Sequence, residues 1–108
     1  MPTFAISNKC TPSFLAAARK DGLSSREPVI RTMVEGIGGK VVAIYWPSSP
    51  DWDLVIIAEL PDADAAYAIQ SFGWATGASQ RMQTTQLRTG AEADAAIARQ
   101  LIWTAPSS

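Results

Sequence analysis

Two apolar segments near the middle of the chain constrain its fold more than any other feature. Residues 40–46 (KVVAIYW) and residues 53–60 (DLVIIAEL) each have strand length, and both carry apolar side chains at odd and even positions. The intervening PSSPD holds two prolines, two serines and an aspartate, which favours a tight connection. The sequence therefore predicts two neighbouring strands whose faces are both covered.

Further elements follow from the hydrophobic periodicity on either side of this pair. Alternation predicts a first strand over residues 2–8, and a more polar fourth strand is expected over residues 80–88. Helices are expected near residues 11–22 (a short helix or an irregular turn), 28–37, 63–75 and 90–103. This order, βαββαβ with a C-terminal helix, is that of the ferredoxin-like α+β sandwich. We expect one domain over residues 1–103 and a flexible tail over residues 104–108.

Local signals mark the helix boundaries. Ser24 and Glu27 have the spacing of a capping box, although Pro28 suits a slightly later start of the second helix better. The glycines within residues 36–39 should end that helix, and Asp62 should cap the next one.

The ferredoxin-like order leaves one sheet face without helices, because right-handed crossovers put both connecting helices on the same side. The apolar side chains on the other face would form a patch larger than a monomer usually exposes. We therefore expect a homodimer that buries this face. The alternative is that the C-terminal helix folds across it.

Composition and charge narrow the possible partners. Hydrophobic residues make up 47% of the chain and charged residues 18%, as in a globular domain. Nine basic and ten acidic residues give a net charge of -1 without a basic cluster, so no nucleic-acid partner is expected. No apolar run approaches the roughly 20 residues of a membrane span. Because no signal sequence is recognisable either, a cytoplasmic protein without a membrane partner is expected.

Residue types limit the available chemistry. Histidine is absent and Cys10 is the single cysteine, which excludes His-based triads, His metal ligands and an intrachain disulfide. We expect no cofactor and no metal, since the acidic residues Glu59, Asp62 and Asp64 are explained more simply by helix capping than by a cation site. Cys10 should be an inert thiol, because no neighbouring base would hold it as a thiolate.

Several short motifs together resemble the GYD domain family. MPTF, GIGGK, VVAIYW, WDLVIIAE, LPDADAA and TTQLR occur in that family's order and spacing, from about Met1 to Arg88. The Gly-Tyr-Asp tripeptide of the family corresponds to Asp51-Trp52-Asp53, which keeps the aspartate and an aromatic residue but lacks the glycine. The resemblance implies a ferredoxin-like fold of the dimeric α/β-barrel group. Its structural relatives include small-ligand binders and cofactor-independent monooxygenases, which gives a prior on function and no more.

Six residues are candidates for ligand binding: Asn8, Tyr45, Trp52, Asp53, Trp74 and Arg88. The aromatic side chains could form a wall for a planar ligand, or pack in the core or a dimer interface. Asp53 could be a base at a pocket mouth, or accept backbone hydrogen bonds in its turn. Asn8 could bond a ligand or cap a loop. Arg88 could pair with a ligand anion, with Glu59 or with a partner chain.

These residues support three hypotheses. The first is a dimeric module that binds a small aromatic or acyl ligand in an apolar cavity near Trp74, with Asn8 or Arg88 as polar groups. The second is a cofactor-independent monooxygenase or isomerase acting on a small aromatic substrate, which requires Asp53 or Glu59 to converge with Arg88. The third is an assembly partner whose polar fourth strand pairs with another chain.

Overall fold

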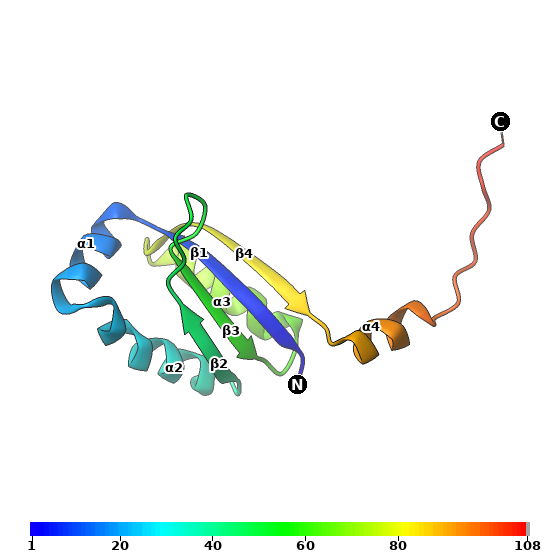
Figure 1. Ribbon diagram of the computed structural model, residues 1–108, viewed down its shortest axis with the longest axis horizontal. Coiled ribbons are helices and arrows are strands. Elements are labelled where there is room, and N and C mark those ends of the chain that lie inside the picture. The colour runs from blue at the N-terminus through cyan, green and yellow to red at the C-terminus, as the bar shows by residue number, and fades with distance from the viewer. Residues whose placement is uncertain (108) are drawn as a thin grey trace.

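The four strands form one antiparallel sheet with the helices beside it. A computed structural model describes residues 1–107, so Ser108, the last residue of the expected tail, lies outside the described residues. The elements are β1 (Thr3–Cys10), α1 (Pro12–Asp21), the 3-10 helix η1 (Leu23–Arg26), α2 (Glu27–Gly36), β2 (Lys40–Tyr45), β3 (Leu54–Glu59), α3 (Ala63–Ala75), β4 (Ser79–Leu87) and α4 (Gly90–Ile97) (Figure 1). The strand order β2-β3-β1-β4 confirms the ferredoxin-like α+β fold.

Strand alternation decides which side chains meet the helices. In β1 every even-numbered residue from Phe4 to Cys10 is buried, and every odd-numbered residue is half-buried. β3 has the same pattern, with Leu54 and Ile56 buried on the helix side. Because Asn8 is an even-numbered residue of β1, the alternation places a polar amide among apolar side chains.

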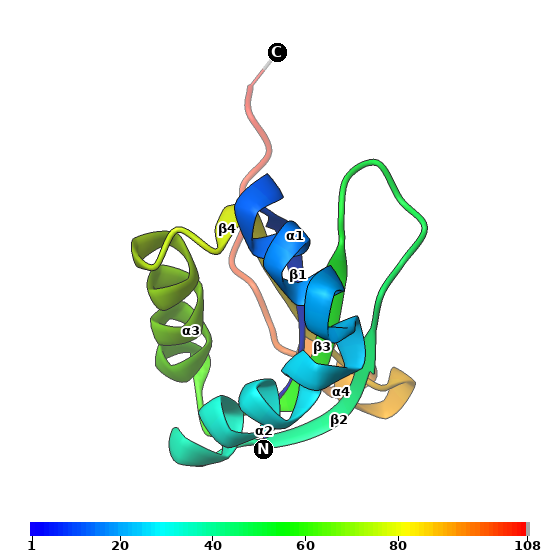
Figure 2. The ribbon, with the colours of Figure 1, turned by 90° about the vertical axis from the view of Figure 1, so that its left-hand side faces the viewer.

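The two connecting helices cover the buried face of the sheet unevenly. α2 packs against β2, whereas α3 packs against β4 and β1. Ile30 and Val34 of α2 and Ala66 and Ile69 of α3 belong to the core beneath them. The last turn of α2 lies near the start of α3, and the two helices diverge from there (Figure 2). They therefore cover the sheet as an open V rather than as a closed pair.

Two of the expected helix boundaries are confirmed. The Asp62 carboxylate accepts a hydrogen bond of 2.9 Å from the backbone N–H of Ala65 and so caps α3. Gly38 follows the end of α2 with a φ of 88°, and its N–H donates to the carbonyl of Glu35. This left-handed conformation suits glycine and stops the helix.

Of the two starts considered for the second helix, the later one at Pro28 is confirmed, and the capping box at Ser24 and Glu27 does not form. Ser24 lies inside η1, and α2 begins at Glu27 without any side-chain hydrogen bond at its cap. Pro28 then stands in the first turn of α2, where its missing N–H costs no helical hydrogen bond. The 3-10 turn thus moves the start of α2 later and puts Arg26 directly before it.

The C-terminal segment projects away from the sheet (Figure 1). α4 ends at Ile97 instead of near residue 103, and none of its residues is buried. A helix this short gains little from its own hydrogen bonds, so it needs packing partners in order to extend. Beyond it, Leu101, Ile102 and Trp103 are all exposed. α4 therefore does not fold across the sheet of its own chain.

The other side of the sheet, called the open face below, consists of the side chains that point away from α2 and α3. The strand register puts Ala5 and Ser7 of β1, Ala43 and Tyr45 of β2, Val55 and Ile57 of β3, and Gln83 and Thr85 of β4 on it. The open face is thus apolar over β2 and β3 and polar over β4. No helix of residues 1–107 covers it.

Candidate ligand-binding site

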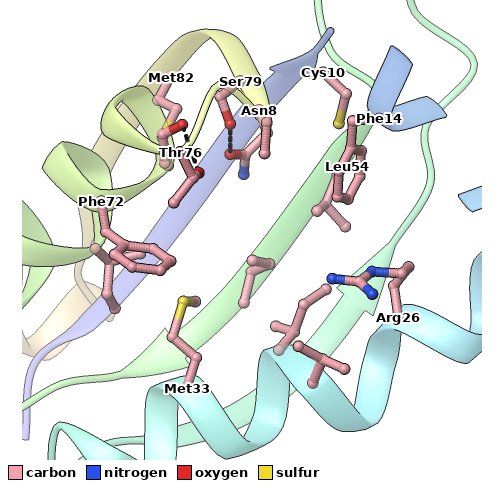
Figure 3. Close-up of a pocket in the computed structure, with 16 residues that line it drawn as sticks. Asn8, Cys10, Phe14, Arg26, Met33, Leu54, Phe72, Thr76, Ser79 and Met82 are labelled. Carbon is pink, nitrogen blue, oxygen red and sulfur yellow. Dashed lines mark hydrogen bonds between the residues drawn. The ribbon is translucent and has the colours of Figure 1, made fainter. Parts of the chain in front are cut away.

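A cavity of about 140 Å³ lies between the sheet and the helices, over the second half of β1 and the start of β3. Figure 3 shows its wall, which is mainly apolar and includes side chains from both α2 and α3. The lining residues are Asn8, Cys10, Phe14, Arg26, Val29, Ile30, Met33, Leu54, Ile56, Ile69, Phe72, Gly73, Thr76, Ala78, Ser79 and Met82. A concave apolar space with a few polar groups is the usual form of a small-ligand site.

Asn8 is the buried polar group of this wall, with 6% of its surface exposed. Its Oδ1 accepts a hydrogen bond of 3.0 Å from the Ser79 hydroxyl. Its Nδ2 has only a marginal contact of 3.5 Å with the carbonyl of Ile6, and it points toward the cavity in Figure 3. Asn8 therefore offers a hydrogen-bond donor to an occupant of the cavity.

Arg26 brings a positive charge to the opposite part of the wall. Its guanidinium lies 5.5 Å from the centroid of the Phe14 ring, within the range of a cation–π contact. Its Nε is buried and has no hydrogen-bond partner among the described residues. The ion pairs within residues 1–107 join Lys9 to Asp53 and Arg81 to Asp51, and neither involves Arg26. The lining contains no Asp or Glu, so Arg26 is the charged residue of the cavity wall.

Cys10 contributes a neutral thiol. Burial, aided by the nearby Asp53 carboxylate and opposed by Lys9, raises the pKa of the Cys10 thiol to about 11. The thiol therefore stays protonated at neutral pH and is a poor nucleophile. It acts in the wall as a small apolar group.

The opening of the V between α2 and α3 gives access to the cavity. Met33 of α2 and Phe72 of α3 face each other there (Figure 3), and both also line two shallower hollows on the outer side. Phe72 is 59% exposed, which is high for a large apolar side chain. Because Met33 is unbranched and flexible, this entrance can adapt to what passes through it.

The six candidates from the sequence do not come together. Asn8 lines the cavity, whereas Tyr45 lies on the open face in register with Val55. Trp74 is 48% exposed on α3 and does not line the cavity, and Arg88 follows the end of β4 as an exposed side chain. The sheet therefore separates Asn8 from Tyr45.

Trp52 and Asp53 fasten the connection between β2 and β3 to the neighbouring strands. The Arg81 guanidinium stacks over the Trp52 ring at 4.7 Å from its centroid. The Asp53 carboxylate accepts a hydrogen bond of 3.0 Å from the backbone N–H of Cys10 and lies 3.6 Å from the Lys9 ammonium. These contacts hold residues 51–53 against β1 and β4, so Trp52 and Asp53 stabilise the connection between β2 and β3.

The groups that the enzyme hypothesis requires do not converge. Asp53, Glu59 and Arg88 do not line the cavity. Glu59 lies at the same end of the sheet as Arg88, since Thr3 of β1 is in register with both Glu59 and Leu87, but the ion pairs among residues 1–107 do not join the two side chains. Asp62 is engaged in the cap of α3. Across residues 1–107, no group of three or more Cys, Asp or Glu side chains is placed to hold a metal ion.

Of the cavity residues, the sequence candidates include only Asn8, and the missed ones include Phe14, Arg26, Met33 and Phe72. Arg26 was obscured because the segment SSREP reads as an ordinary helix start, and the others because apolar residues at helical spacing read as core. One usable signal was the alternation of β1, which puts Asn8 on the same face as Phe4 and Ile6. A buried amide needs hydrogen-bond partners, so this pattern already indicates Asn8 as a candidate site residue.

Comparison with known proteins agrees with the fold. A model of the GYD domain matches residues 6–97, which is most of the chain. No curated protein and no solved structure matches. Within residues 1–107, none of the helices combines the length and the apolar character that a membrane crossing requires.

Proposed function

We propose that the chain, which belongs to the GYD domain family, binds a small and mainly apolar ligand in the cavity between its helices and its sheet. The observation that carries this proposal is the poorly satisfied Asn8 amide in an apolar wall. A buried donor without a good partner costs free energy, and a ligand acceptor would recover it. The V between α2 and α3 supplies the route of entry.

We also propose a homodimer formed through the open face. Val55 and Ile57 lie there beside Tyr45, with no helix of residues 1–107 over them. A second copy of the same surface would cover this apolar area by a two-fold contact. A cytoplasmic location stays a prediction.

The alternative activity, a cofactor-independent monooxygenase or isomerase, has less support. Such an enzyme needs a base beside its substrate, and no carboxylate among the described residues lines the cavity. Arg26 could hold a substrate anion, but a cation alone does not remove a proton. Ligand binding is therefore the function that the geometry favours.

Titration of the 15N-labelled protein with toluene tests the binding site. Toluene should shift the amide signals of lining residues such as Cys10 and Gly73.

Val29 and Val42 offer a matched pair of variants, since they are 50% and 55% exposed and only Val29 lines the cavity. Val29→Trp should obstruct the cavity and weaken toluene binding at least about tenfold, a change of roughly 1.4 kcal/mol. Val42→Trp should leave it unchanged. Unshifted signals in the unsubstituted protein, or equal weakening by both variants, would contradict the proposal.

A further inference from the structure

We infer that the ligand of this cavity is a small organic anion, a carboxylate carried by an apolar body about the size of one ring, and that Arg26 binds the carboxylate. The inference rests on the proposed function and adds the chemical class of the ligand. Two independent features carry it: the unpaired guanidinium in the wall and the size of the cavity.

The charge of the wall favours an anion. The Arg26 Nε is buried without a hydrogen-bond partner, and no described carboxylate forms an ion pair with this side chain. Asp21 shares a neighbouring hollow with Arg26, yet it makes no such pair. Arg26 as a whole is half-buried, but its Nε N–H is held away from water without an acceptor, which is costly, so an occupant with an anionic oxygen beside it would be stabilised. The planar guanidinium offers parallel N–H donors that match the two oxygens of a carboxylate.

The guanidinium is already positioned for this contact. It stacks on the Phe14 ring, and it is directed into the cavity in Figure 3. Stacking limits the rotation of the long side chain, so less conformational entropy is lost when a ligand binds. Arg26 is therefore pre-organised as an anion receptor.

The size and the second polar group define the rest of the ligand. A cavity of about 140 Å³ is close to the roughly 150 Å³ of an engineered apolar cavity that accepts benzene. Ile56 and Ile69 provide apolar walls for one ring. The Asn8 Nδ2 is a further donor, which favours an acceptor atom elsewhere on the ligand. Both polar groups thus donate hydrogen bonds, and neither calls for a cationic ligand.

Benzoate and benzamide provide the test, because they share a shape and differ in charge at neutral pH. Calorimetric or NMR titration of the full chain should show benzoate binding at least about tenfold more tightly than benzamide, as expected for hydrogen bonds to a charged group. Arg26→Met should remove this preference and leave benzamide affinity within about twofold. Arg26→Lys, which keeps the charge, should retain part of it. Arg31→Met is the matched control, since Arg31 is an exposed residue of α2 outside the cavity and its loss changes the net charge equally.

The outcomes separate the two proposals. If toluene and benzamide bind but benzoate is not preferred, or if Arg26→Met keeps the preference, the anion inference is wrong and the binding function stands. If none of the three probes binds in the cavity, both proposals fall. Equal losses in Arg26→Met and Arg31→Met would show a general charge effect and would also overturn the role of Arg26. Unfolding curves of each variant exclude loss of fold as the cause.

Discussion

At the residue scale, the fold satisfies the polar groups around the sheet to very different degrees. The Asp53 carboxylate accepts a backbone N–H at one oxygen and lies beside the Lys9 ammonium at the other, so both oxygens have a partner that stabilises the connection before β3. Asn8 is bonded well at Oδ1 and poorly at Nδ2, and the Nε of Arg26 has no partner among residues 1–107. Both incompletely satisfied groups line the same cavity. Such a coincidence points to binding because unsatisfied buried groups are otherwise selected against by their cost.

Gly39 and Gly36 give a residue-scale prediction about packing. A Cβ at Gly39 would lie 2.7 Å from the carbonyl oxygen of Glu59, 2.8 Å from Leu60 Cδ2 and 3.0 Å from Val34 Cγ1. Since one of these atoms is backbone and the two side chains are buried, Gly39→Ala should lower the free energy of unfolding by about 1–3 kcal/mol. Urea denaturation measures this change.

Gly36→Ala is the control, because a Cβ at Gly36 meets nothing within 4 Å. Gly36 is the last residue of α2, and alanine is a better helix former than glycine by up to about 1 kcal/mol. Gly36→Ala should therefore leave the stability unchanged or raise it slightly. A similar loss in both variants would mean that the approach of Gly39 to β3 is not the constraint.

At the element scale, the sequence predicted the core of the fold better than its ends. The period-two pattern of β1 and β3 and the Asp62 cap of α3 survive in the structure because burial and a strong local hydrogen bond enforce them. In the SSREP segment the start of α2 near Pro28 was predicted but the 3-10 turn before it was not, since a 3-10 turn and a capped helix start use the same residue types. The cavity itself depends on the divergence of α2 and α3, a tertiary property that no local pattern encodes.

α4 gives an element-scale prediction about pH. The Thr89 hydroxyl accepts from the Glu92 N–H at 3.1 Å, and the Glu92 carboxylate accepts from the Thr89 N–H at 3.0 Å. Hydrogen bonding from Thr89, chiefly from its backbone N–H, holds the pKa of Glu92 below its usual value. The stabilisation is therefore present above the ordinary pKa of a glutamate and is lost as the pH falls through the lowered pKa. Because α4 buries none of its residues, it should fray on acidification.

The 13Cα chemical shifts of residues 90–97 between pH 7 and pH 2 measure this fraying. Glu92→Gln keeps an acceptor but cannot ionise, so its α4 should be less helical at pH 7 and should change less on acidification. Asp94 is present in both proteins, so its contribution cancels from the comparison. An α4 that loses helical shifts equally in both proteins would show that Glu92 is not the cause of the fraying.

At the scale of the whole molecule, the shape is unusual for an isolated chain of this length. The radius of gyration is 17.0 Å and the long dimension is 59 Å, whereas a compact domain of about 100 residues has a radius near 13 Å. The excess comes from α4 and the residues that follow it, which carry Ile97, Leu101, Ile102 and Trp103 in exposed positions. An arm with this many apolar side chains, together with an apolar open face, indicates surfaces that a second copy would cover.

Ile57 offers the sharpest test of this dimer. It lies between Ala5 of β1 and Ala43 of β2, so its side chain has small neighbours on both sides at the centre of the apolar part of the open face.

Sedimentation equilibrium should give twice the chain mass of 11.5 kDa for the unsubstituted protein. Ile57→Glu should give a monomer, because two copies would have to bury an unpaired carboxylate each at the interface. Its circular dichroism should stay that of the parent, since position 57 does not face the helix-side core. Ser71→Glu, on the exposed side of α3, should leave the dimer intact. A monomeric parent, or a dimer that survives Ile57→Glu, would place the contact elsewhere than on the open face.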